Sequence, residues 1–301
     1  MSLPAATSPP AASIRGMVLG ITAYSLFAIH DAFVKGVIAE LPAVQILFVR
    51  SLVVAAICLA VGRRPLVKEL LTSPHKPMLL VRAVVMLAAF VLFYSTARDL
   101  GLAEMTTLYY FAPILTIVLA VIFLRERPTP TRICAAAIGF FGVIVATNPV
   151  GLTIGVPALM VIGAAACWSI AMILMRNISK SESSLVQIFS LNLFFVVAMG
   201  LASIWLWQPM GPREIAFAVA AGVVGGMAQY VLVEAARLIP ASVLGTVEYG
   251  ALIWSFVFGF LFWGEQPEGF VYWGAALIVA AGLLLAWSEQ RSRRRVVSEA
   301  P

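Results

Sequence analysis

Ten apolar stretches, each long enough to cross a lipid bilayer, constrain the fold of this chain more than any other feature. A helix needs ~20 apolar residues to cross the hydrocarbon core, because every backbone N–H and C=O group must be satisfied within the segment. The stretches lie at residues 14–34, 43–62, 78–97, 103–124, 131–148, 156–176, 184–207, 214–236, 241–262 and 270–288. The sequence therefore predicts an all-α integral membrane protein with ten transmembrane helices.

The composition excludes a water-soluble fold. Apolar residues make up 62% of the 301 residues and charged residues only 11%, whereas soluble domains average ~25% charged residues. We expect residues 1–13, rich in Pro and Ala, to form a disordered tail and residues 289–301 to form a basic tail. The first apolar stretch does not end at a small-residue cleavage site, so we expect this span to be retained.

The distribution of Lys and Arg predicts the orientation of the chain. Ten spans place both termini on one side, where fifteen of the twenty basic residues fall, against three on the other side. Basic loops stay in the cytoplasm, so we expect both termini to be cytoplasmic. The basic cluster at residues 291–295 then suits anionic membrane lipids as partners, and we expect no nucleic acid.

The two halves of the chain resemble each other. A shift of 139 residues places Tyr110 on Tyr249 and the Glu-x-Pro turn at 126–128 on the turn at 265–267. Each half has five spans, an odd number, so the second half must enter the membrane from the opposite side. We expect an inverted repeat with a binding site near the midplane between the halves. The predicted repeats are residues 14–148 and 156–288.

Ionisable residues inside the spans are candidates for function, because charges are costly in lipid. The first three spans carry five of them, His30, Asp31, Lys35, Arg50 and Arg82. Their depths fit a structural ion pair between Asp31 and Arg50 as well as a direct ligand or proton-carrying role. We expect Arg82 either to reach the cytoplasmic headgroups or to face a cavity. All five are predicted to act in charge pairing or gating.

Glu248 lies about two turns into the ninth span and has no partner in its own helix. We expect it to face an aqueous cavity and to meet a cationic or hydrogen-bonding group of a substrate. Aromatic side chains at mid-depth suit a pocket for a planar solute, and core packing is the alternative for each of them. The predicted substrate-binding residues are Tyr24, Tyr94, Tyr109, Tyr110, Trp168, Gln229, Glu248, Tyr249 and Trp254.

Motifs of several other function classes do not occur in the sequence. There is no GxxxxGK[ST] phosphate loop, no HExxH, no GxSxG and no metal-binding spacing among the three cysteines. We therefore expect no enzyme activity, no cofactor and no metal, which leaves transport of a small-molecule metabolite. A membrane-embedded enzyme and a lipid flippase or scramblase stay open as alternative functions. Association of the protein into a homodimer also stays open.

Four short runs and two turns are similar to a known family. They are residues 30–35, 45–50, 81–83 and 111–114, together with the turns at Glu126 and Glu265 and with Tyr249 and Trp254. These features resemble the EamA-type transporters of the drug/metabolite transporter superfamily over nearly the whole chain. The Asp-x-x-x-Lys and Gln-x-x-Phe-x-Arg patterns are most similar to the branch that includes riboflavin, S-adenosylmethionine and opine-metallophore transporters.

The resemblance implies two inverted five-helix EamA repeats that form a basket, with spans five and ten at its periphery. It also implies secondary transport of a small organic metabolite by alternating access, such as riboflavin, S-adenosylmethionine or a similar aromatic or zwitterionic solute. Export of amino acids or other small metabolites is the alternative. Members of the branch often have Tyr-x-Glu in span nine, where this chain has Ala251. The nearest acid is Glu248, one turn earlier, so the role of the family glutamate does not carry over to Ala251.

Overall fold

The computed structural model describes residues 13–38, 40–96, 108–126, 128–147, 155–264 and 269–298. Most of the predicted N-terminal tail, the start of the fourth span and the turn at 265–267 lie outside these residues. The helices are α1 (Ile14–Lys35), α2 (Ala43–Thr72), α3 (Lys76–Ser95), α5 (Ala112–Leu124), α6 (Pro130–Thr147), α7 (Val156–Ile178), α8 (Ser184–Leu206), α9 (Pro212–Leu238), α10 (Ala241–Glu248), α11 (Gly250–Trp263) and α12 (Gly269–Ser298).

These helices confirm the ten-span fold predicted from the sequence. Within the described residues, eight helical segments are long and apolar enough to cross a membrane, with α10 and α11 together forming one of them. The shorter apolar helices α5 and α6 supply the remaining two spans. α2 runs ten residues past its predicted end, through a kink at Arg63 (φ 51°), and α12 continues into the predicted basic tail.

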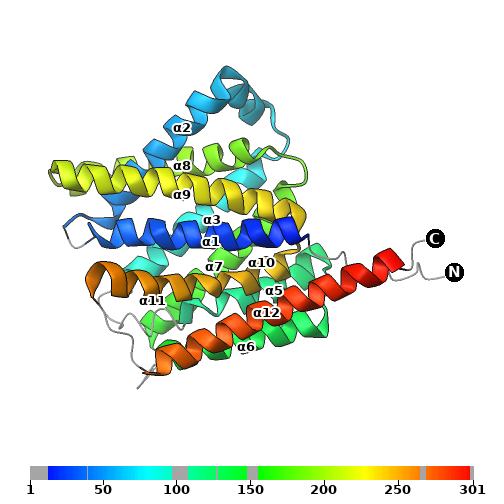
Figure 1. Ribbon diagram of the computed structural model, residues 1–301. Helices are drawn as coiled ribbons and strands as arrows, with labels where there is room; N and C mark the ends of the chain where they lie inside the picture. Colours follow the sequence, from blue (N-terminus) through cyan, green and yellow to red (C-terminus); the bar gives the residue numbers. More distant parts are fainter. Residues whose placement is uncertain are drawn as a thin grey trace.

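The packing of the helices shows the internal symmetry of the fold. α1 packs on α9 and α3 on α7, while α2 packs on α8 and α6 on α12. If the halves are exchanged, so that α1 replaces α7, α2 replaces α8, α3 replaces α9 and α6 replaces α12, this set of contacts is unchanged. α6 and α12 lie side by side at one edge of the molecule, and the start of α1 and the end of α12 lie at one end of the bundle (Figure 1). We call this end the terminal end and the other the opposite end.

Close helix contacts depend on glycine at several crossings. A Cβ added to Gly222 of α9 would lie 2.7 Å from Cβ of Val53 and 3.0 Å from the carbonyl oxygen of Arg50, both on α2. A Cβ on Gly274 of α12 would lie 2.5 Å from the carbonyl oxygen of Gly142 on α6. Small residues allow backbones in a membrane to approach to this distance, where dispersion contacts hold them together.

Polar contacts tie the two halves together at each end of the bundle. At the terminal end, Glu126 accepts hydrogen bonds from the backbone N–H groups of Ala241 (2.9 Å) and Ser242 (3.3 Å) and thereby caps α10. At the opposite end, the side chain of Gln45 donates to the carbonyl oxygen of Gln208 (2.8 Å) and accepts from its N–H (2.9 Å). Each set of bonds thus joins a residue of the first half to residues of the second half.

Glu126→Ala is expected to lower the free energy of unfolding by about 1–2 kcal/mol, because α10 loses the carboxylate that caps its N-terminus. Thermal unfolding of the purified protein in detergent measures this loss. Glu126→Gln retains one acceptor oxygen, and we expect a smaller loss for it. Equal stability of both variants and the unchanged protein would show that the cap contributes nothing.

Candidate functional site

The span built from α10 and α11 is interrupted at Tyr249. The N–H of Leu252 bonds to the carbonyl oxygen of Tyr249 at 3.2 Å, three residues back, which makes the turn tighter than in an α-helix. At the matching place in the first half, just before α5, the N–H of Phe111 bonds to the carbonyl oxygen of Leu108 at 3.2 Å. Interrupted spans in corresponding positions of two repeats are where transporters commonly bind substrates.

Tyr110 and Tyr249 meet at these two interruptions. Their rings are stacked, with centroids 6.0 Å apart and planes inclined by 28°. They are the two tyrosines that the 139-residue shift places on each other. The axis that relates the halves therefore passes close to this ring pair, and the side chains around it come from both repeats.

Further aromatic side chains extend this stack into a cluster. Tyr109 lies edge-on to Tyr110 (6.1 Å between centroids) and tilted against Trp168 of α7 (6.4 Å). Tyr24 of α1 donates its hydroxyl hydrogen to Oε2 of Glu248 at 3.4 Å. Five of the predicted aromatic residues thus lie together beside Glu248, and we call Tyr24, Tyr109, Tyr110, Trp168 and Tyr249 the aromatic cluster.

Glu248 ends α10 and is only 4% exposed. Among the described residues its carboxylate forms no ion pair, and Tyr24 donates a long hydrogen bond to it. The indole N–H of Trp168 also approaches this carboxylate, whereas the hydroxyl of Tyr249 is buried without a hydrogen-bond partner among the described residues. The cluster therefore holds a buried acid and one polar group that lacks a partner in the described chain.

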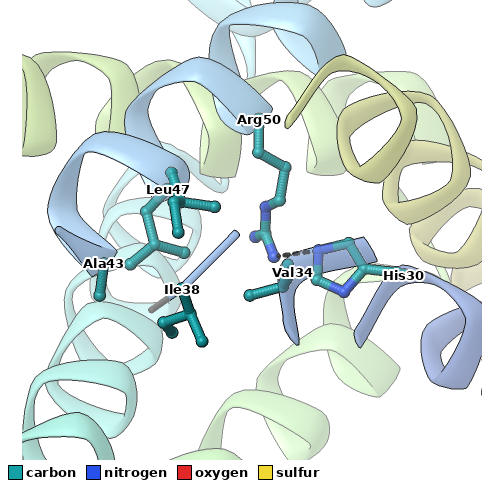
Figure 2. A pocket seen from close by; sticks show the side chains of 7 residues that line it. His30, Val34, Ile38, Ala43, Leu47 and Arg50 are labelled. Carbon is teal, nitrogen blue, oxygen red and sulfur yellow. Dashed lines mark hydrogen bonds between the residues drawn. The ribbon is translucent and has the colours of Figure 1, made fainter. Parts of the chain in front are cut away.

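A second polar group lies where α1 meets α2. Nη1 of Arg50 lies 3.0 Å from Nε2 of His30, and Nδ1 of His30 lies 2.9 Å from Oδ1 of Asp31. Figure 2 shows Arg50 and His30 pointing toward each other beside a hollow of about 10 Å³ that both help to line, room for roughly one water molecule. His30 thus contacts both Asp31 and Arg50, the two residues expected from their depths to pair. The imidazole is buried, whereas the neighbouring Asp31 side chain is 74% exposed.

The Arg50 side chain also lies beside a larger cavity. Its guanidinium stacks over the ring of Phe90, 5.6 Å from the centroid. Phe90 lines a cavity of about 440 Å³ between α2, α3 and α8, and this cavity shares Ala43 and Leu47 with the small hollow. The apolar wall of the cavity therefore adjoins a cationic side chain.

The remaining predicted site residues lie elsewhere. Arg82 is 5% exposed and donates to the carbonyl oxygen of Gln187 at 3.4 Å, so it does not extend to the membrane surface. Gln229 accepts from Asn192 at 2.8 Å and links α9 to α8. Trp254 is 39% exposed and stacks on Phe258, within its own helix α11. Lys35 is exposed at the end of α1, and the Tyr94 side chain lies outside the described side chains.

Two residues that support the site were not anticipated from the sequence. A Cβ added to Gly139 of α6 would lie 2.5 Å from Cδ2 of Tyr249, and one added to Gly225 of α9 would lie 2.7 Å from Cδ2 of His30. Each glycine makes room for one ring of the site. Nothing in the sequence near these glycines distinguishes them from others in the spans, because the rings they accommodate come from distant segments.

Comparisons with known proteins agree with this architecture. A solved structure with 19% sequence identity matches 92% of this chain and 98% of its own length with a TM-score of 0.78, which shows a shared fold. The chain is 26% identical to the pseudopaline exporter CntI of Pseudomonas aeruginosa over 90% of this chain and 95% of that protein. It is 29% identical to a riboflavin transporter of Rhizobium johnstonii over 61% of each chain.

A third relative is an S-adenosylmethionine uptake transporter of Rickettsia felis, 26% identical over 63% of this chain and 65% of its own length. The profile of the EamA-like transporter family matches this chain twice, at residues 14–148 and 156–287. These two matches cover most of the sequence, and their division coincides with the symmetry seen in the helix packing. The chain is therefore a multi-pass membrane protein that belongs to the EamA-like transporter family.

Proposed function

We propose that this protein is a secondary transporter that carries a small organic metabolite across a bacterial inner membrane, with both termini in the cytoplasm. The substrate binds between the two repeats, against Glu248 and the aromatic cluster. The observation that carries this proposal is the stack of Tyr110 on Tyr249 at the junction of two interrupted spans. A site on the axis between the repeats stays in place while the repeats rock around it.

The aromatic cluster suits a substrate with a planar part. Tyr and Trp rings offer apolar faces for stacking, and each adds one polar group that fixes the orientation of a ligand. Relatives named as riboflavin and S-adenosylmethionine transporters support a solute of this kind. We therefore propose an aromatic or zwitterionic metabolite as the substrate.

The polar contacts at the two ends of the bundle would act as alternating closures. Opening the terminal end requires Glu126 to release the N-terminus of α10, and opening the opposite end requires Gln45 to release Gln208. The contacts of Asp31 and Arg50 with His30 would form and break between the same states. The inverted symmetry suits such a mechanism, because the two similar halves exchange their conformations when the protein passes from one state to the other.

Export is the second candidate direction. The pseudopaline exporter matches this chain over 90% of its length, whereas the riboflavin relative matches 61%. Flux measured in both directions across liposomes would separate export from uptake. Lipid scrambling by the same liposomes would instead support a flippase.

Thermal unfolding in detergent tests the binding of riboflavin, S-adenosylmethionine, amino acids and metal-chelating opines, since a ligand that binds only the folded protein raises its melting temperature. We expect a concentration-dependent rise for one class.

Tyr110→Ala is expected to weaken that binding by about tenfold or more, because stacking on an aromatic side chain contributes ~1–3 kcal/mol. Trp254→Ala removes an aromatic ring outside the cluster and serves as the control. Loss of binding in the Trp254 variant alone would place the site elsewhere.

A further inference from the structure

We infer that the aromatic cluster takes a positively charged organic group, an ammonium or sulfonium, which it holds against Glu248. This inference rests on the proposed function, because it names the chemical class of the substrate at the same site. It follows from three features of the cluster: the buried acid Glu248, the arrangement of the rings, and a polar group without a partner.

The first feature is a buried acid that forms no ion pair among the described residues. Glu248 is 4% exposed, and a carboxylate buried in a membrane protein is costly unless a cation accompanies it or it takes up a proton. The two arginines inside the spans contact other groups, since Arg50 contacts His30 and Phe90 while Arg82 donates to the carbonyl oxygen of Gln187. A cationic ligand would favour the ionised form of this acid.

The second feature is the group of rings beside this acid. Tyr110 and Tyr249 stack at 6.0 Å, while Tyr109 lies 6.4 Å from Trp168 between centroids. The hydroxyl of Tyr24 reaches the carboxylate itself. Ring faces carry partial negative charge and attract cations, most strongly in Trp and Tyr, and several rings around one position select quaternary ammonium groups. The rings and the acid therefore favour the same sign of charge.

The third feature is a buried polar group without a partner in the described chain. It is the hydroxyl of Tyr249, which can donate or accept a hydrogen bond. Buried groups of this kind are normally satisfied, and a ligand with a polar group beside its cation would satisfy it. The site therefore favours a polar organic cation over a purely apolar one.

A matched pair of probes tests this inference on the full chain in detergent at pH 7.5. Phenyltrimethylammonium carries a fixed positive charge, whereas N,N-dimethylaniline has the same ring, one methyl group fewer and no charge at this pH. Titration of tryptophan fluorescence measures the binding of each. We expect phenyltrimethylammonium to bind at least about tenfold more tightly, in line with cation–ring attraction reinforced by a carboxylate.

Three variants show whether Glu248 causes the preference for the cation. Glu248→Gln should abolish it and Glu248→Asp should keep it, whereas Glu40→Gln, which removes an exposed acid paired with Arg213, should leave it unchanged. Gel filtration shows whether each variant remains monodisperse. Equal binding of both probes by the unchanged protein, or a preference that survives Glu248→Gln, would overturn the inference.

The same titrations separate this inference from the proposed function. If both probes bind equally and Tyr110→Ala weakens both, the cluster binds substrates without selecting their charge, so the inference fails while the site stands. If Tyr110→Ala changes the binding of neither probe, the site itself is wrong, and the inference falls with it.

Discussion

Gly139→Ala is expected to lower the transport rate by about tenfold, although α6 lies at the edge of the bundle. The added Cβ would lie 2.5 Å from Cδ2 and 3.0 Å from Cε2 of Tyr249. Tyr249 is 1% exposed and stacked on Tyr110, so its ring cannot move away without disturbing the stack beside Glu248. Overpacking of this kind costs ~1–3 kcal/mol, which corresponds to roughly five- to 150-fold in an equilibrium constant.

Uptake of the identified substrate into liposomes measures this effect. Gly163→Ala is the control, because its added Cβ would meet nothing closer than Leu92 Cδ1 at 3.5 Å, an ordinary contact distance. Both substitutions add one methyl group to a glycine within a span. Full transport by the Gly139 variant would show that the position of Tyr249 does not matter for translocation.

Gly274→Ala is expected to lower the free energy of unfolding by about 2–3 kcal/mol or more. Its added Cβ would lie 2.4 Å from Cβ of Ala146 and 2.5 Å from the carbonyl oxygen of Gly142. Backbone atoms cannot rotate out of the way as a side chain can, so α6 and α12 must separate along their contact. We expect this to be the largest stability effect of a single methyl group in the chain.

Thermal or denaturant unfolding in detergent measures this loss. Gly282→Ala is the matched control on the same helix, because no atom outside its own neighbourhood lies within 4 Å of the added Cβ. Alanine favours the helix over glycine by ~1 kcal/mol, so this control is expected to be neutral or stabilising. A Gly274 variant as stable as the Gly282 variant would disprove the close contact of α6 with α12.

The charged residues show where prediction from the sequence was incomplete. Their location inside the spans was evident, because ionisable residues stand out in apolar segments. Their contacts were not, because depth along a helix does not specify rotation about its axis. His30 is buried between Asp31 and Arg50, against Gly225 of α9. No pattern in the first two spans identifies a neighbour on α9.

The aromatic residues illustrate the same limit. Tyr110 and Tyr249 could be paired from the 139-residue shift, since residues equivalent in the two repeats that lie near the axis must also lie near each other. Trp254 comes only five residues after Tyr249, yet it is 39% exposed and stacks on Phe258 of its own helix. Both are large aromatic residues in one span, and the sequence does not indicate which of them faces inward.

The sequence by itself determined that the chain folds in a lipid bilayer, how many spans it has and that it divides into two halves. These properties depend on the length and order of apolar segments, because a bilayer of fixed thickness accepts only helices that satisfy their own backbone. Only the tertiary structure decided which side chains surround Glu248. In a membrane the outer face of a helix is as apolar as its packed face, as shown by Val18 of α1 at 55% exposure and Ala23 at 0%. Hydrophobic periodicity therefore cannot reveal the rotation of a helix, and the site forms only when helix packing fixes that rotation.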